Sequence, residues 1–254
     1  MSAHKFHVNS QNSKDLAGFV FCILVGTFDM HCLGGRVLKP ELLDTLPPEE
    51  ARASLADIVR INKHWGGLST LRKLVDEAIP YDEAFTFLDV GAASGDMGRA
   101  VLEARPLAHV TNLDYIAAHL ESCIGARVAA DAFSLPFADG AFDYVFNSLF
   151  LHHFTGDQVA ALLREFGRVA RKQVLVIDLW RHPIPYYFMS LTQPLFGWQP
   201  VTVSDGQISV EAAFHASELC ELAARAGLHD IRTRAYIPAF RIALSAQVQD
   251  CVER

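Results

Sequence analysis

The chain has 254 residues, of which 51% are hydrophobic and 20% are charged. This length fits one domain with additional helices, and the apolar content is too high for a largely disordered chain. The 22 lysines and arginines stand against 29 acidic residues, which gives a net charge of −7, and because such a surface repels phosphate backbones we expect no nucleic-acid partner.

The N-terminal segment differs from the rest of the chain. Residues 16–28 form an apolar run of 13 residues, which is too short for a stable membrane span of about 20 residues. Its length suits the apolar region of a secretion signal, but Asp15 adjoins it and no small-residue cleavage site follows. We expect residues 1–39 to be an N-terminal extension that is loosely attached, packed on the domain as a helix, or removed as a signal. A chain starting near Lys39 is expected to fold and to remain active.

Five cysteines are scattered along the chain without a CxxC pair or a metal-type spacing. This pattern suits reduced thiols and predicts a cytoplasmic protein.

Two helices are predicted ahead of the first strand, over residues 40–80. The prolines and acidic residues at 47–50 are typical of a helix start, and Gly66 and Gly67 separate the first helix from the second. The buried face of the first is expected at Leu55, Ile58, Val59 and Asn62.

From Phe85 onward, short apolar runs alternate with helical stretches, which predicts parallel strands with helical crossovers. The predicted fold is α/β, a doubly wound Rossmann-like seven-stranded sheet that is mostly parallel with an antiparallel last strand. Residues 40–254 make up this domain, and residues 183–214 are a helical insert after the fifth strand. The expected strands are residues 85–90, 109–114, 127–130, 143–148, 173–179, 231–236 and 240–246, and the expected helices are 96–104, 116–124, 156–169, 183–196 and 217–226.

The most informative motif is LDVGAASGD at residues 88–96, between a predicted strand and a predicted helix. Gly91 and Gly95 let the backbone approach a ligand closely, and the following helix offers free amides. Asp114 ends the next strand, 19 positions beyond Gly95, where a carboxylate can accept the ribose hydroxyls of a nucleoside. The motif and the acid together predict an adenosine-containing cofactor, with a purely structural turn as the alternative.

Two cofactors compete for such a turn, a nicotinamide dinucleotide and S-adenosylmethionine. The dinucleotide fingerprint needs glycine at its third and sixth positions to seat a pyrophosphate, but this chain has Ala93 and Asp96 there. The Asp96 carboxylate would repel phosphates, whereas a cofactor with a sulfonium and an ammonium suits an acidic turn. Charge therefore favours S-adenosylmethionine.

Asp89-x-Gly91-x-x-x-Gly95 resembles motif I of the class I S-adenosylmethionine-dependent methyltransferases, with Ala93 in place of a common middle glycine. Residues 131–143 and 147–153 resemble the same family, in particular its ubiquinone/menaquinone-methyltransferase-like branch with a methyltransferase type 11/25 domain. The resemblance covers residues 57–246 and implies methyl transfer from S-adenosylmethionine to a small molecule. The residues expected to bind the cofactor are Asp89, Gly91, Ala92, Gly95, Asp114, Tyr115, Asp131, Ala132 and Asn147.

The resemblance implies that the two helices over residues 40–80 lie over the cofactor as a lid. It also implies that the methyl group and the substrate meet above the fourth and fifth strands. His152 and His153 follow the fourth strand, and one of them is expected to face the pocket as a catalytic base, unless both only bond the loop backbone. No regular ligand spacing surrounds these histidines, so no metal site is predicted. The residues expected to bind substrate are Asp178, Arg181 and His215.

The apolar, aromatic-rich insert would exclude water, which favours an aromatic, polyketide or quinone-like acceptor methylated on oxygen or carbon. Two alternatives remain at this stage, a dinucleotide-dependent oxidoreductase and a catalytically idle cofactor-binding scaffold. The oligomeric state is left open.

Overall fold

The computed structural model describes residues 34–43, 46–237 and 239–248. By its internal contacts the chain divides into Met1–Gly35 and Arg36–Arg254, and every helix and strand named below lies in the second unit. This compact unit starts at Arg36 and not at residue 40 as predicted, because the backbone N–H of Val37 already donates to the carbonyl of Glu211 at 3.1 Å. The apolar run at 16–28 lies outside the described residues.

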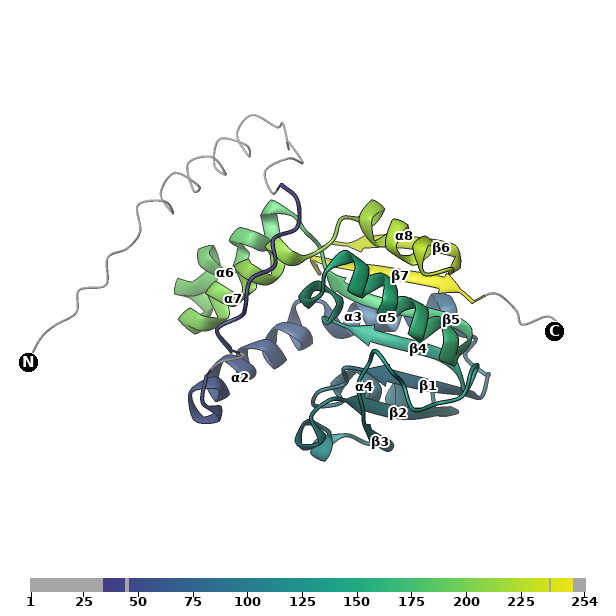
Figure 1. The fold of residues 1–254 in the computed structure, drawn as a ribbon. Helices are drawn as coiled ribbons and strands as arrows, with labels where there is room; N and C mark the ends of the chain where they lie inside the picture. The colour runs from purple at the N-terminus through teal and green to yellow at the C-terminus, as the bar shows by residue number, and fades with distance from the viewer. Residues whose placement is uncertain (1–33, 44–45, 238, 249–254) are drawn as a thin grey trace, which may run out of the picture. The chain divides into compact units, whose positions relative to one another are not determined.

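The described strands form one seven-stranded sheet in the order β3-β2-β1-β4-β5-β7-β6 (Figure 1). The strands β1 to β5 run parallel to their neighbours, and β7 runs antiparallel to both β5 and β6. The predicted fold class is therefore confirmed. The bounds are β1 (Phe85–Val90), β2 (Ala108–Asp114), β3 (Ala126–Ala129), β4 (Phe142–Ser148), β5 (Ala170–Leu179), β6 (His229–Tyr236) and β7 (Arg241–Gln247).

Helices cover both faces of the sheet, as a doubly wound sheet requires. Side chains alternate along β1, so Leu88 and Val90 join one core cluster while Phe85 and Phe87 join the other. The helices α5 and α8 contribute to the first cluster, and α3 and α4 contribute to the second. Their bounds are α3 (Gly67–Ala78), α4 (Asp96–Ala104), α5 (Gly156–Val169) and α8 (Ala216–Arg225).

Three further helices, α2 (Pro48–His64), α6 (Pro183–Phe196) and α7 (Pro200–Ala212), form a group that we call the cap. Figure 1 shows the cap beyond one end of the sheet. The helix α7 contacts α2, α6 and the short 3-10 helix η3 (Leu151–His153), which follows β4. The cap therefore adjoins the carboxyl ends of the parallel strands, where α/β sheets bind their ligands.

The helix α7 was not predicted from the sequence. Its buried positions include Thr202 and Asp205, so it lacks the apolar stripe that reveals most surface helices. The hydroxyl of Thr202 donates to the carboxylate of Asp57 on α2 at 3.2 Å. The carboxylate of Asp205 accepts two backbone N–H groups of the N-terminal segment, from Leu42 and Leu43, at 2.9 and 2.8 Å. Polar contacts thus attach α7 to its neighbours.

The polar side of α7 also explains an error in the predicted orientation of α2. Leu55 and Val59 are 50% and 48% exposed, whereas Ala51, Ser54 and Asp57 are buried. The second predicted lid helix, α3, packs on the sheet with α4 and β7 and belongs to the layered core.

The remaining predicted elements agree with the structure within about three residues, except that residues 116–124 contain a 3-10 helix, η2 (Ala117–Ser122), in place of an α-helix. In the described part of the chain, no helix combines the length and the apolar character that crossing a membrane requires.

Candidate active site

The turn between β1 and α4 is tied to the next strand of the sheet. The backbone N–H groups of Gly91 and Ala92 donate to the carbonyl of Leu113 on β2 at 2.8 and 2.9 Å. Gly91, Ala93 and Gly95 all have positive φ angles of 73°, 45° and 73°. Ala93 therefore adopts a left-handed conformation that favours glycine, and the turn keeps its shape without the middle glycine.

The turn also leaves no room for a side chain at its two glycines. A β-carbon on Gly91 would lie 3.2 Å from the ring of Phe150, and one on Gly95 would lie 2.6 Å from the sulfur of Cys123. Glycine is thus required at both positions, and the turn lies directly against the segment that follows β4.

The Asp114 carboxylate is bound to this turn. It accepts the backbone N–H of Ala93 at 3.0 Å and that of Ile116 at 2.9 Å, and it lies 3.2 Å from Nδ1 of His119. The acid and the glycine motif, 19 positions apart in the sequence, are therefore in direct contact. Tyr115, beside Asp114, is 78% exposed.

Asp89 differs from Asp114 because it is buried beneath the turn. One of its oxygens accepts the backbone N–H of Gly98 in α4 at 3.1 Å, so it joins the strand to the helix. Burial raises the pKa of Asp89 to about 7. Asp89 therefore holds the turn in position from below.

The other predicted cofactor residues lie on the strands beside the turn. Asp131 follows β3, and its exposed carboxylate accepts the backbone N–H of Phe133 at 2.9 Å. Ala132 is buried. Asn147 on β4 donates through Nδ2 to the carbonyl of Val90 at 2.8 Å, while its buried Oδ1 has no protein partner among the described residues. These side chains thus surround the carboxyl ends of β1 to β4.

A cavity of about 240 Å³ lies between the cap and the carboxyl ends of β4 and β5. Leu149, one of its lining residues, immediately precedes Phe150, whose ring packs on Gly91, so one residue separates the cavity wall from the side chain that contacts the glycine turn. The polar groups of its wall include Asn62, His152 and Arg241. Its apolar wall includes Ile58, Ile61, Trp65, Leu149, Phe188 and Met189.

Arg241 is a buried cation in this wall. Its Nη2 donates to Asn62 Oδ1 at 3.4 Å, and its Nε has no partner among the described residues. Burial lowers the pKa of Arg241 to about 10, although the negative charge of Asp178 acts to raise it. The guanidinium therefore stays charged at neutral pH and can pair with an oxygen of a bound molecule.

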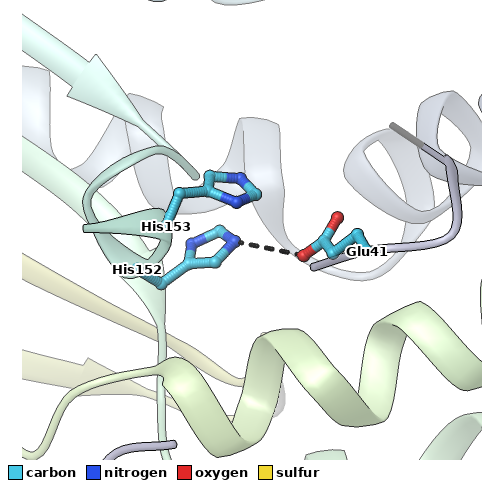
Figure 2. Close-up of side chains that lie close together, drawn as sticks. All are labelled: Glu41, His152 and His153. Carbon is cyan, nitrogen blue, oxygen red and sulfur yellow. Dashed lines mark ion pairs between the residues drawn. The ribbon is translucent and has the colours of Figure 1, made fainter. Parts of the chain in front are cut away.

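His152 lies between two carboxylates. Its Nδ1 is 2.6 Å from Asp178 Oδ1, and its Nε2 is 3.8 Å from Glu41 Oε1 (Figure 2). Burial favours the neutral imidazole, but the charges of Asp178 and Glu41 outweigh it and raise the pKa of His152 to about 9. The ring in this arrangement keeps its proton at neutral pH, which argues against the predicted role of His152 as a general base.

Arg36 fixes the N-terminal segment to the same place. Its Nε donates to the carbonyl of Ala212 at 2.7 Å, and its Nη2 donates to the carbonyls of His152 and Phe154 at 3.2 and 2.9 Å. The guanidinium carbon lies 4.0 Å above the ring centre of Phe214. One arginine thus connects the N-terminal segment, the end of α7 and the loop that carries the histidines.

Comparison with known proteins identifies the domain that contains the glycine turn. Residues 88–177 match the family model of the methyltransferase domain, a stretch that runs from the turn through β5 and includes Asp114, Asp131 and Asn147. The chain therefore contains a methyltransferase domain, in keeping with the resemblance of its motifs to the class I S-adenosylmethionine-dependent methyltransferases. Its methyl donor is accordingly S-adenosylmethionine, and the ubiquinone/menaquinone-like branch stays a prediction.

Solved methyltransferase structures share the fold. A putative O-methyltransferase from Nostoc punctiforme matches with a TM-score of 0.58 and 18% identity, over 94% of this chain and 70% of that one. Human N-acetylserotonin methyltransferase, solved with S-adenosylmethionine, matches with a TM-score of 0.55 and 16% identity, over 94% and 68%.

One curated relative matches in sequence, a protein of Gloeobacter violaceus named 3-dehydroquinate synthase. It is 28% identical over 162 residues, which are 62% of this chain and 37% of that protein. The methyltransferase chain thus spans little more than a third of that relative's length.

Two of the predicted substrate-binding residues of the methyltransferase lie elsewhere. Arg181 is buried, where it donates to the carbonyl of Ala213 at 2.9 Å and pairs with Glu218 at 2.6 Å. His215 precedes α8, and its backbone N–H donates to the same glutamate at 2.8 Å. Both residues hold the start of α8 and neither lines the cavity, which corrects the prediction. Asp178 is fully buried and reaches the cavity only through His152.

The sequence did not reveal Arg36, Glu41 or Arg241 as site residues. Arg36 lies in a segment assigned to the extension, Glu41 borders it, and Arg241 begins a strand far along the chain. No motif marks them, because only the fold brings the three segments to the same cavity.

Proposed function

We propose that this domain transfers a methyl group from S-adenosylmethionine to a hydroxyl oxygen of a small, largely apolar acceptor bound in the cap cavity. The observation that carries the proposal is an apolar cavity beside the glycine turn with a histidine–glutamate cluster in one wall. Apolar walls suit an aromatic, polyketide or quinone-like ring and exclude water from the reaction. The polar cluster favours an acceptor hydroxyl over an acceptor carbon.

The residues around the turn fit the methyl donor. Asp114 would accept the ribose hydroxyls, and Asp131 would accept the adenine amino group with Ala132 and Tyr115 alongside. The backbone of Gly91, Ala92 and Gly95 would hold the methionine part. The unpartnered Oδ1 of Asn147 supports the proposal, since it is an acceptor suited to the donor's ammonium group.

When bound, S-adenosylmethionine supplies an electrophilic methyl carbon on a positively charged sulfur. An acceptor oxygen held in the cavity would take this methyl group, and the sulfur would keep the electron pair of the broken bond as S-adenosylhomocysteine. The carboxylate of Glu41 would accept the hydroxyl proton and pass it to water, while the protonated His152 beside it keeps its own proton. The cavity aligns the two reactants, which is the main requirement of such a displacement.

Arg241 gives the cavity a preference among apolar acceptors. Its buried guanidinium has an unpartnered Nε, so a carbonyl or phenolate oxygen on the acceptor would complete its hydrogen bonds. We therefore expect an acceptor that carries a second oxygen beside or across the ring from the methylated hydroxyl.

The test uses a substitution that fills the cavity without touching the donor site. Gly206 lines the cavity on α7, where a β-carbon would lie 2.6 Å from Met189 Sδ. Gly206→Val should raise KM or abolish turnover with phenolic and enolic acceptors, while calorimetric affinity for S-adenosylhomocysteine stays unchanged. Gln207→Val is the matched control, because Gln207 lies on the same helix outside the cavity lining.

Full activity of Gly206→Val on an acceptor that wild type uses would place the acceptor elsewhere. A wild-type chain that binds S-adenosylhomocysteine but methylates no member of a broad acceptor panel would support the idle-scaffold alternative instead. The cytoplasmic location remains part of the proposal, in keeping with the free thiols of Cys123 and Cys220 in the described residues.

A further inference from the structure

Glu41, His152 and His153 bring three potential ligand atoms together in the cavity wall. One nitrogen from each histidine and one oxygen of Glu41 all lie within 4.8 Å of one another. Figure 2 shows the two imidazoles side by side and Glu41 facing them from the segment before α2. Glu41 and His152 line both the acceptor cavity and a second cavity of about 290 Å³, so an ion could reach the cluster from one cavity and an acceptor from the other.

The environment of His152 is that of a metal ligand. Its backbone N–H and its Nδ1–H both donate to Asp178, at 3.2 and 2.6 Å, and Asp178 is fully buried. This fixes the ring with Nε2 directed at Glu41 (Figure 2), and a bound cation would take the place of the Nε2 proton, which leaves to water. A carboxylate that holds one ring nitrogen while the other ligates is the common second layer of metal-bound histidine.

The spacing between His152 and Glu41 also suits a shared ion. At 3.8 Å the two atoms are too far apart for a direct hydrogen bond of about 2.7–3.2 Å. Two ligands about 2.1 Å from one zinc ion are roughly 3.4 Å apart at a tetrahedral angle and about 4.2 Å apart when opposite. The observed separation falls between these values, so small side-chain movements would complete the site.

We propose that Glu41, His152 and His153 bind one divalent transition-metal ion, with Zn²⁺ as the best match, and leave a coordination position open toward the cap cavity. Two imidazoles and one carboxylate suit zinc, whereas magnesium and calcium prefer oxygen ligands. This reverses the sequence-based prediction of no metal site, which considered only the histidines and had no reason to include Glu41.

The ion would give the acceptor hydroxyl a defined place. An acceptor oxygen in the open position loses its proton more readily beside the cation, and an adjacent second oxygen could occupy a further position. This part of the inference rests on the proposed function, whereas the binding of the ion does not. It predicts a preference for acceptors with neighbouring oxygens, such as catechol-like rings.

The experiment is calorimetric titration of the full chain, stripped with a chelator, with ZnCl₂ and separately with MgCl₂. We expect one saturable zinc site and no comparable magnesium site. Loss of a second-layer partner weakens metal affinity by roughly 10- to 100-fold, and Asp178→Asn should lower the affinity for zinc within that range. Glu41→Gln and His153→Ala each remove a ligand and should lower the affinity for zinc by more than that. With Co²⁺ as probe, the absorption spectrum should lack a sulfur-to-metal charge-transfer band.

His109→Gln is the matched control, because His109 is exposed on β2, away from the cluster, and should leave zinc binding unchanged. Affinity for S-adenosylhomocysteine, measured on every variant, shows that the domain is folded. The inference is overturned if wild type binds no zinc, or if Glu41→Gln and His153→Ala bind it as wild type does. Zinc binding without methyl transfer to any acceptor would refute the proposed function and leave the metal site standing.

Discussion

Replacing Arg36 by alanine should destabilise the domain, although the sequence places this residue in a dispensable extension. The side chain donates three hydrogen bonds to backbone carbonyls at 2.7–3.2 Å and lies 4.0 Å above the Phe214 ring. Hydrogen bonds from a charged donor contribute about 1.5–3 kcal/mol each in favourable cases, and a partly exposed cation–π contact contributes about 1 kcal/mol. These contributions are not additive, because water can replace part of the guanidinium.

We therefore expect Arg36→Ala to lower the free energy of unfolding by about 3 kcal/mol, which corresponds to a fall in Tm of roughly 6–12 °C for a domain of this size. Arg36→Lys should give an intermediate loss, because an ammonium cannot reproduce the planar fork of donors. The measurement is urea denaturation followed by circular dichroism, supported by a thermal scan.

Arg52→Ala is the control, since Arg52 is exposed on α2, and a surface change of this kind should stay within about 0.5 kcal/mol. A chain that starts at Lys39 loses the same contacts and should resemble Arg36→Ala. Equal stability of Arg36→Ala, Arg52→Ala and wild type would refute the reasoning.

Two further substitutions test the donor side of the site. Asp114→Ala should weaken the binding of S-adenosylhomocysteine by about 1–3 kcal/mol, which is the cost of leaving the ribose hydroxyls unpaired. The measurement is calorimetry, with Asp82→Ala as the control because Asp82 is exposed. An unchanged affinity of Asp114→Ala would remove Asp114 from the donor site. Asp89→Asn tests the effect of burial on the Asp89 carboxyl group. In the folded protein the pKa of this carboxyl is raised to about 7 from 3.8. The unfolded chain therefore releases the carboxyl proton at a lower pH than the folded chain does. Wild type should therefore lose stability relative to Asp89→Asn as the pH rises from about 4 to 7 and show no further relative change above that; urea midpoints that shift in parallel across this range would contradict the prediction.

Much of the donor side could be predicted because its signals are local in the sequence. The motif at residues 88–96 combines a strand, glycines and a helix start, and Asp114 follows at the end of the next strand. Parallel strands place such ends at one edge of the sheet. The contact between Asp114 and the N–H of Ala93 is the direct result of that rule.

The errors share a physical cause, which is that polar contacts between distant segments hold these parts of the chain. Apolar periodicity placed Leu55 and Val59 inside, but α2 faces α7 through Asp57 and Thr202. Arg181 looked suited to a substrate because it follows a strand end, yet it pairs with Glu218. A charged residue near a strand end has the same sequence signal whether it binds a ligand or a neighbouring helix.

The sequence by itself determined the layered α/β sheet, the glycine turn and the acid that bonds to it, because hydrophobic period, turn geometry and spacing along a strand are local properties. Only the tertiary structure decided which side chains meet in the acceptor cavity. Glu41, His152 and Arg241 are separated by long stretches of chain, and they come together because Arg36 and the polar face of α7 hold the N-terminal segment over the end of the sheet. Such contacts depend on three-dimensional packing, and no regularity of the sequence records them.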